Sequence, residues 1–140
     1  MNVILDVNIY ITFGLDGEVD NLKELLLHPR LKIHYNQELL EEFLTVAVRK
    51  KFFTTALNEN AREIAALILL YGVNVGRLNG KQFAYPKLKH PETDIKDLYL
   101  LKLCKEASAD YLVTGDKWLL KLKSFAKTEI ISLSQFRKMI

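Results

Sequence analysis

The chain alternates short, continuous apolar runs with longer segments in which apolar residues recur every three or four positions. Residues 3–5 form such a run, as expected of a strand buried on both faces of a parallel sheet. Residues 32–35, 73–75, 111–114 and 130–131 predict further strands, with helical segments between them. Strands that alternate with helices predict an α/β fold, in which helices cover both faces of a mainly parallel central sheet.

Side chains that can cap a helix N-terminus precede or open five of the helical segments: Asp20, Asn36, Asn58, Thr93 and Ser134. We expect Pro29 to end the first of these helices and Gly72 to end the third. The second and fourth helices are expected to reach about residues 51 and 107, and residues 118–122 predict a short helix.

The composition fits a single domain over residues 1–140, with 49% hydrophobic and 26% charged residues. The only cysteine, Cys104, cannot form an internal disulfide bond, which favours a reducing compartment. No apolar run approaches the roughly 18 residues of a membrane-spanning helix. The N-terminal residues lack the basic start and the small-residue cleavage site of a signal peptide. The predicted location is the cytoplasm.

The net charge of +3 and the pI near 8.9 are weak evidence for a polyanionic partner. Basic residues gather in three segments: Arg49-Lys50-Lys51, Lys87 to His90, and Lys117 with Lys121 and Lys123. These segments either attract a polyanion or form ordinary solvated faces.

Two aspartates follow predicted strands. Asp6 comes directly after residues 3–5, and Asp116 follows residues 111–114 after one glycine. Ligand sites of parallel α/β sheets form at the carboxyl ends of the strands, so both aspartates are candidate site residues. The alternative is that each carboxylate only caps a helix or forms a turn.

Asp97 lies in the middle of an apolar helix face. At about 100° per residue, Leu100, Leu101 and Cys104 share this face. A carboxylate there is costly to bury unless it is paired or binds a cation, so Asp97 is either a metal ligand or part of a buried salt bridge. Asp94, one turn earlier, either joins the site or stabilises the helix N-terminus.

The helix after Asn36 contains two adjacent glutamates. Glu42 borders the apolar arc of this helix, beside Leu39 and Val46, whereas Glu41 points toward solvent. Glu42 is therefore the better candidate site residue.

Four acids, Asp6, Glu42, Asp97 and Asp116, can thus converge at one edge of the sheet, where their charges repel unless a cation lies among them. Mg²⁺ and Mn²⁺ prefer such oxygen ligands. The three histidines are scattered and one cysteine cannot supply a thiolate pair, which argues against a zinc site. The sequence also lacks a serine nucleophile motif and a phosphate-binding loop. These observations predict a Mg²⁺ or Mn²⁺ site among the four acids.

The segments around these acids resemble a known family. Residues 3–8 are similar to the strand and D-x-N start of PIN domains, and residues 38–43 resemble the helix whose acid, here Glu42, precedes a hydrophobic residue. The most specific match is residues 109–116, which end in Thr-Gly-Asp. Over about residues 1–133 the chain resembles the toxins of toxin–antitoxin pairs within this superfamily. It departs at Val7, where threonine is common, and in the lower acidity of residues 94–97.

The resemblance implies a Rossmann-like three-layer α/β/α sandwich and a nuclease that cleaves single-stranded RNA with Mg²⁺ or Mn²⁺. It also implies an antitoxin partner and, in many members, a homodimer. Counting back from the Thr-Gly-Asp turn aligns Asp97 with the usual metal-site acid. The predicted catalytic metal ligands are Asp6, Glu42, Asp97 and Asp116, with Asp94 as a further candidate.

In the predicted mechanism, Asn8 and Thr114 orient the metal ligands, while Arg49, Lys117 and Lys121 hold the RNA backbone. Two other functions remain open. One is a small phosphatase or phosphotransferase with an aspartate nucleophile, although haloacid-dehalogenase-like enzymes have a second aspartate where this chain has Asn8. The other is a catalytically inactive PIN-like binding module.

Overall fold

The computed structural model describes residues 1–49, 55–75 and 91–140, and within them the side chains of residues 1–48, 59–75 and 98–140. In chain order, the elements are β1 (Asn2–Leu5), α1 (Val7–Leu15), α2 (Val19–Leu26), β2 (Lys32–Tyr35), α3 (Gln37–Arg49), α4 (Thr55–Tyr71), β3 (Val73–Asn74), α5 (Pro91–Glu106), β4 (Tyr111–Val113), α6 (Lys117–Leu122), β5 (Ser124–Phe125), β6 (Thr128–Ile131) and α7 (Leu133–Met139).

The described strands form one six-stranded sheet in the order β3-β2-β1-β4-β6-β5. Four of the five strand pairs are parallel, and only β5 runs antiparallel, against β6. The predicted α/β fold with a mainly parallel sheet is therefore confirmed. Successive strands are added on one side of β1 as far as β3, and the chain then returns to place β4 on the other side of β1. This reversal creates a switch point between β1 and β4.

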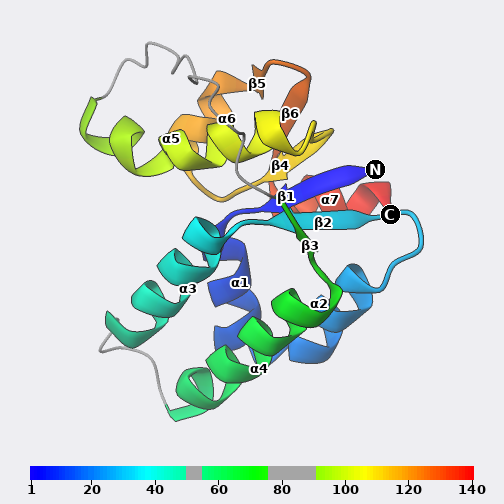
Figure 1. Ribbon diagram of the computed structural model, residues 1–140, viewed down its shortest axis with the longest axis vertical. Coiled ribbons are helices and arrows are strands. Elements are labelled where there is room, and N and C mark those ends of the chain that lie inside the picture. The colour runs from blue at the N-terminus through cyan, green and yellow to red at the C-terminus, as the bar shows by residue number, and fades with distance from the viewer. Residues whose placement is uncertain (50–54, 76–90) are drawn as a thin grey trace.

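Helices cover both faces of the sheet, as the alternating pattern predicts. Figure 1 shows α1 to α4 on one side of the strands and α5 with α6 on the other. Helix α1 contacts α2, α3 and α4, so these helices form one packed layer. The strands between the layers supply fully buried residues such as Ile4, Leu112 and Val113. A strand that is covered on both faces needs apolar residues at successive positions, which explains the continuous runs in the sequence.

The observed helix caps correct part of the sequence prediction. Asn36 caps α3 as predicted, because its Oδ1 accepts a 2.8 Å hydrogen bond from the backbone N–H of Leu39. Ser134 does not cap the last helix. Ser132 does so instead, in a capping box with Gln135 that satisfies two backbone N–H groups. Asp20 lies inside the first turn of α2 rather than before it. Helix α4 begins at Thr55 rather than after Asn58.

Gly72 ends α4 as predicted, and the structure gives a steric reason. A Cβ at this position would lie 2.5 Å from the Ile68 carbonyl oxygen and 2.8 Å from Cδ1 of Tyr35. A side chain at this position would collide with α4 and with Tyr35 of β2. Only glycine therefore allows the chain to pass from α4 into β3 here.

Strand β5 was not predicted from the sequence. It has two residues, and its hairpin with β6 depends on positive φ angles at Lys123 and Ala126, of 64° and 51°. Neither residue type favours that conformation, so the turn has no local sequence signal.

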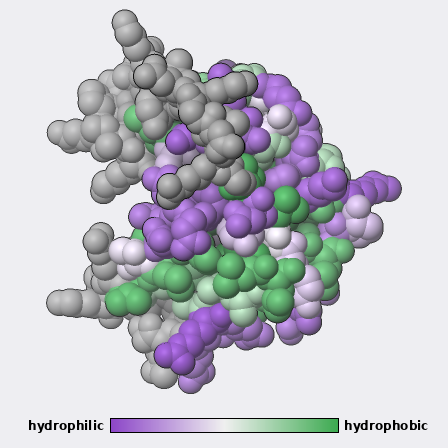
Figure 2. All heavy atoms as spheres, in the orientation of Figure 1, coloured by the Kyte–Doolittle hydropathy of each residue, from purple (hydrophilic) through white to green (hydrophobic). Residues whose placement is uncertain are grey.

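No helix in the described ranges is both long and apolar enough to cross a membrane. Several large apolar side chains are nevertheless exposed on α3 and α4, among them Val48 and Leu70. Figure 2 shows the corresponding apolar surface over the helices below the sheet. This surface lies on the α1–α4 side of the molecule.

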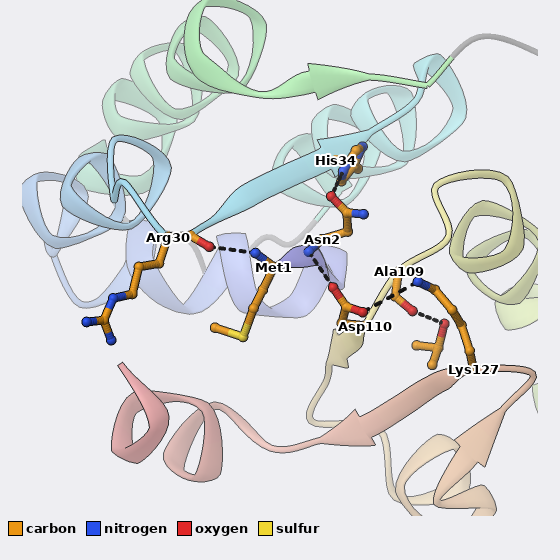
Figure 3. Close-up of polar contacts among 8 residues, drawn as sticks. Met1, Asn2, Arg30, His34, Ala109, Asp110 and Lys127 are labelled. Carbon is orange, nitrogen blue, oxygen red and sulfur yellow. Dashed lines mark hydrogen bonds and ion pairs between the residues drawn. The ribbon is translucent and has the colours of Figure 1, made fainter.

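Polar contacts fix the amino-terminal ends of the central strands (Figure 3). The Asp110 carboxylate, just before β4, accepts a 2.8 Å hydrogen bond from the backbone N–H of Asn2 in β1. The Asn2 side chain in turn contacts Nε2 of His34 in β2, at 3.0 Å. Lys127 forms an ion pair with Asp110 at 3.5 Å. Strand alignment at this end is thus set by polar groups, which leaves the opposite, carboxyl-terminal end of the strands for the candidate site.

Candidate active site

The parallel pairing of β1 with β4 places the two strand-following segments next to each other. Leu5 is paired with Val113, so Asp6 and Thr114 both emerge at the carboxyl end of the sheet. The backbone N–H of Asp6 donates a 2.9 Å hydrogen bond to the Val113 carbonyl. This position is the switch point, where open α/β sheets form ligand sites.

The Thr114 hydroxyl connects the two predicted acids. Its Oγ1 donates a 2.7 Å hydrogen bond to Oδ2 of Asp6 and accepts a 3.0 Å hydrogen bond from the backbone N–H of Asp116. Thr114 is itself fully buried. The hydroxyl thereby fixes the Asp6 side chain and the Asp116 backbone relative to one another.

Asp6 is a buried carboxylate that does not cap a helix. It occupies the N-cap position of α1, but its side chain makes no capping hydrogen bond. Only 5% of the residue is exposed, and this burial raises the pKa of its carboxyl group. The hydrogen bond from Thr114 opposes the rise in pKa, whereas the negative charge of Asp116 adds to it. The backbone N–H groups of Val7 and Asn8, in the first turn of α1, also lower this pKa, so the carboxylate faces the helix N-terminus although it makes no capping hydrogen bond.

Asp116 does act as a helix cap. Its Oδ1 accepts hydrogen bonds from the backbone N–H groups of Trp118, at 2.8 Å, and Leu119, at 3.4 Å. These contacts hold the carboxylate in one orientation and leave Oδ2 as its second oxygen. The Thr114 hydroxyl contacts both residues, and the negative charge of Asp116 adds to the rise in the pKa of Asp6. Capping and a place in an acidic pair are thus compatible for Asp116.

No basic side chain neutralises this pair in the described part of the chain. The ion pairs found among those side chains join Lys102 to Glu106, Lys127 to Asp110 and Arg137 to Glu18. A buried carboxylate beside a second carboxylate is costly without a cation. The pair therefore has the chemistry of a site for a hard divalent cation.

Helix α5 carries Asp94 and Asp97, whose side chains lie outside the described set. Further along this helix, Leu100, Leu101 and Cys104 are fully buried, as the predicted apolar face requires. Burial raises the pKa of Cys104 to about 12, and the charge of Asp6 contributes to that rise. The Asp6 carboxylate is thus near this face of α5. Asp97 lies two helical turns before Cys104 in the sequence, and its part in the site remains a prediction.

Helix α3 begins directly after β2 and carries both glutamates. Leu39 and Phe43 are fully buried, which confirms the predicted apolar arc. Glu41 and Glu42 are both exposed, so exposure does not separate them. Glu41 accepts a 3.1 Å hydrogen bond from Nε2 of Gln37. Within the side chains that the structure describes, no three acids form a group that could hold a metal ion.

The remaining candidates lie on α1, α6 and α3. Asn8 is exposed in the first turn of α1, and Lys117 and Lys121 are exposed on α6. The side chain of Arg49, at the end of α3, lies outside the described set. The sequence pattern did not single out Trp118, which lies two residues after Asp116. The feature that could have identified Trp118 in the sequence is its place two residues after a site acid. In the structure this large aromatic residue is 38% exposed.

A hollow of about 280 Å³ lies elsewhere, between α1, α2 and α7. Phe13, Leu25 and Arg137 are among its lining residues, and none of the predicted site residues lines it. The hollow is therefore separate from the site of Asp6 and Asp116.

Comparison with known families agrees with the observed fold. A family model described as PIN domain matches residues 2–118, which include the strand before Asp6 and the turn before Asp116. No curated protein and no solved structure matches the chain significantly. PIN domains are generally metal-dependent nucleases. Since the match spans most of the sequence, the chain belongs to the PIN domain family.

Proposed function

We propose that the protein is a Mg²⁺- or Mn²⁺-dependent endoribonuclease that cleaves single-stranded RNA and is the toxin of a toxin–antitoxin pair. The observation that carries the proposal is the Asp6–Asp116 carboxylate pair at the switch point. Asp6 is buried there, and no basic side chain in the described ranges neutralises it. Membership of the PIN family supports nuclease chemistry at this pair.

The donor set fits a hard divalent cation. Asp6 and Asp116 each have a carboxylate oxygen besides the one that accepts the hydrogen bonds of Thr114 or α6. These oxygens would hold the cation, together with Asp97 and Glu42 and with Asp94 as a further candidate. Such an ion, when bound, activates water and stabilises the charge that develops on the scissile phosphate.

Hydrogen bonds within the chain hold the two aspartates of this site in fixed orientations. Thr114 holds Asp6 in place, and the backbone amides of α6 hold Asp116. Both contacts fix a ligand before substrate arrives, which lowers the reorganisation needed during the reaction. In this proposal Asn8 helps to orient the ligands, and Arg49, Lys117 and Lys121 attract the RNA backbone to a site that is itself negative.

The finer parts of the proposal rest on the family resemblance. Toxin–antitoxin pairs are typical of this family, so we propose an antitoxin protein as a partner. A homodimer is suggested by the family resemblance alone. A cytoplasmic location is consistent with the single free and buried thiol of Cys104.

The test is cleavage of a labelled RNA by the purified full-length protein. Single-stranded RNA, double-stranded RNA and single-stranded DNA of one sequence are incubated with Mg²⁺, with Mn²⁺ or with EDTA. We expect internal cuts in the single-stranded RNA, only with a metal ion present, and none with the Asp6→Asn variant. A wild-type protein that leaves all three substrates intact in both metals overturns the proposal.

Two further measurements separate the alternatives. Trapping of a phosphorylated Asp6 would indicate an aspartate-nucleophile phosphatase. Calorimetric titration that detects no uptake of Mn²⁺ or Mg²⁺ would indicate a binding module without a metal centre.

A further inference from the structure

Trp118 lies at the edge of the acidic pair. Its backbone N–H donates the 2.8 Å hydrogen bond that fixes Oδ1 of Asp116, so the backbone of Trp118 lies next to this carboxylate. Leu119, the next residue, is buried to 3% exposure and anchors α6 on the core. The backbone of Trp118 beside Asp116 is thus held by the contacts of α6.

The indole is 38% exposed, although tryptophan is usually among the most buried side chains. The ammonium group of Lys121, one turn later on α6, lies 4.4 Å from the centroid of the indole ring. This cation–π contact holds a positive charge at the aromatic surface. A partly exposed aromatic ring next to a lysine is the combination that binds single-stranded nucleic acids, in which bases stack and phosphates pair with cations.

We propose that Trp118 is a stacking platform for a nucleobase of the RNA, directly beside the Asp6–Asp116 pair, with Lys121 contacting the adjoining phosphate. The inference rests on the proposed function and names the substrate-binding group at that site. A base held on Trp118 fixes the nucleotide next to the scissile phosphate. Stacking also requires an unpaired base, which gives a physical reason for a preference for single strands.

The experiment uses a property of this chain: Trp118 is its only tryptophan. Intrinsic tryptophan fluorescence therefore reports on this one side chain. The full-length Asp6→Asn variant, which prevents cleavage, is titrated with a short single-stranded RNA, and binding is measured in parallel by anisotropy of a labelled strand. We expect fluorescence quenching that follows the binding curve. An abasic ribose-phosphate strand of equal length should bind more weakly and leave the fluorescence unchanged.

Variants on the same background separate stacking from packing. Trp118→Leu should weaken binding of the base-containing RNA by about tenfold or more, while binding of the abasic strand changes little. Trp118→Phe retains an aromatic face and should lose less affinity. Tyr71→Ala is the matched control, because Tyr71 is an aromatic residue of similar exposure, 39%, at the end of α4 beside the far edge strand β3. It should bind RNA as the parent does.

RNA binding without quenching, with unchanged affinity in Trp118→Leu, overturns the stacking proposal and leaves the nuclease assignment intact. Quenching and base-dependent binding in a wild-type protein that cuts no RNA support the stacking platform and overturn the nuclease assignment. Absence of any RNA binding overturns both. Circular dichroism verifies that each variant is folded.

Discussion

The hydroxyl of Thr114 donates a 2.7 Å hydrogen bond to the carboxylate of Asp6, a residue 108 positions earlier in the chain. Both residues are buried, and they follow adjacent parallel strands. The contact places a neutral donor on a carboxylate that burial and the charge of Asp116 drive toward protonation. It thus favours the charged form of Asp6, which is the form that the proposed role as a metal ligand requires.

We predict that Thr114→Val raises the pKa of Asp6, because it removes the side-chain donor that lowers this pKa while burial and the Asp116 charge remain. The acidic limb of the pH–rate profile for RNA cleavage should therefore move to higher pH. The variant should also lose about 1–3 kcal/mol of stability, since two polar groups lose a buried partner.

Thr114→Ser is the control for this change, because it keeps the hydroxyl group. Its pH profile should stay close to that of the wild type. An unchanged acidic limb in Thr114→Val, measured on a variant that is folded, would show that Asp6 does not control the reaction.

Asp6→Asn and Asp116→Asn should each abolish cleavage and leave the fold intact. Without metal, the melting temperature should stay equal or rise. For Asp6 the sign follows from its pKa, which burial in the folded protein raises above the ordinary value of an aspartate. The ionisation of Asp6 opposes folding most strongly above its folded-state pKa. This penalty shrinks as the pH falls below that value and is gone below the unfolded-state pKa. The gain in melting temperature should therefore be greatest near neutral pH and vanish in acid.

Asp110→Asn provides the opposite case at the other end of β4. The hydrogen bond from the Asn2 N–H holds the pKa of Asp110 below its usual value, with a smaller effect of Lys127. Its ionised form therefore stabilises the fold above the unfolded-state pKa, and this contribution is lost as the pH falls through the folded-state pKa. Melting curves should show a loss of stability at neutral pH, with RNA cleavage retained. For the two site acids, a wild-type cleavage rate in Asp6→Asn or in Asp116→Asn would show that the substituted aspartate does not belong to the active site.

Glu42→Gln should reduce cleavage strongly, whereas Glu41→Gln should scarcely affect it. The reason is the position of Glu42 beside the buried arc of α3, while the Glu41 side chain is bonded to Gln37 along the helix surface. Each variant is the control for the other, since both remove one negative charge from neighbouring exposed positions. Comparable losses from both changes, measured as cleavage rates in Mn²⁺, would mean that the functional face of α3 is misassigned.

The double change Lys117→Ala and Lys121→Ala should weaken RNA binding and make it less dependent on salt, because fewer counterions are released. Affinity for Mn²⁺ should not fall. Anisotropy on the Asp6→Asn background at several salt concentrations measures both the affinity and the slope. Lys23→Ala with Lys32→Ala removes the same charge from exposed positions on α2 and β2 and should leave the slope unchanged. Equal slopes in the two double variants would exclude α6 from the RNA-binding surface.

The sequence by itself determined the elements that build this fold. Continuous apolar runs predicted the strands around Ile4 and Leu112, because a strand covered on both faces excludes polar residues. The cap at Asn36 and the stop at Gly72 were also predicted, since each depends on a short-range hydrogen bond or a local steric limit. The acids after two strands were visible for the same reason, because an aspartate after an apolar run is a local feature.

Only the tertiary structure decided which of these local features meet. Apolar strands are interchangeable in pattern, so the order β3-β2-β1-β4-β6-β5 and the neighbourhood of Asp6 and Asp116 follow from packing of the whole chain. Packing likewise decided that Asp116 caps a helix while Asp6, in an equivalent position, does not. Hydrogen bonds of side chains to nearby backbone are encoded locally, whereas burial, charge repulsion and the contact with Thr114 depend on residues far apart in sequence. The site is therefore a product of strand pairing, and the sequence supplied only its parts.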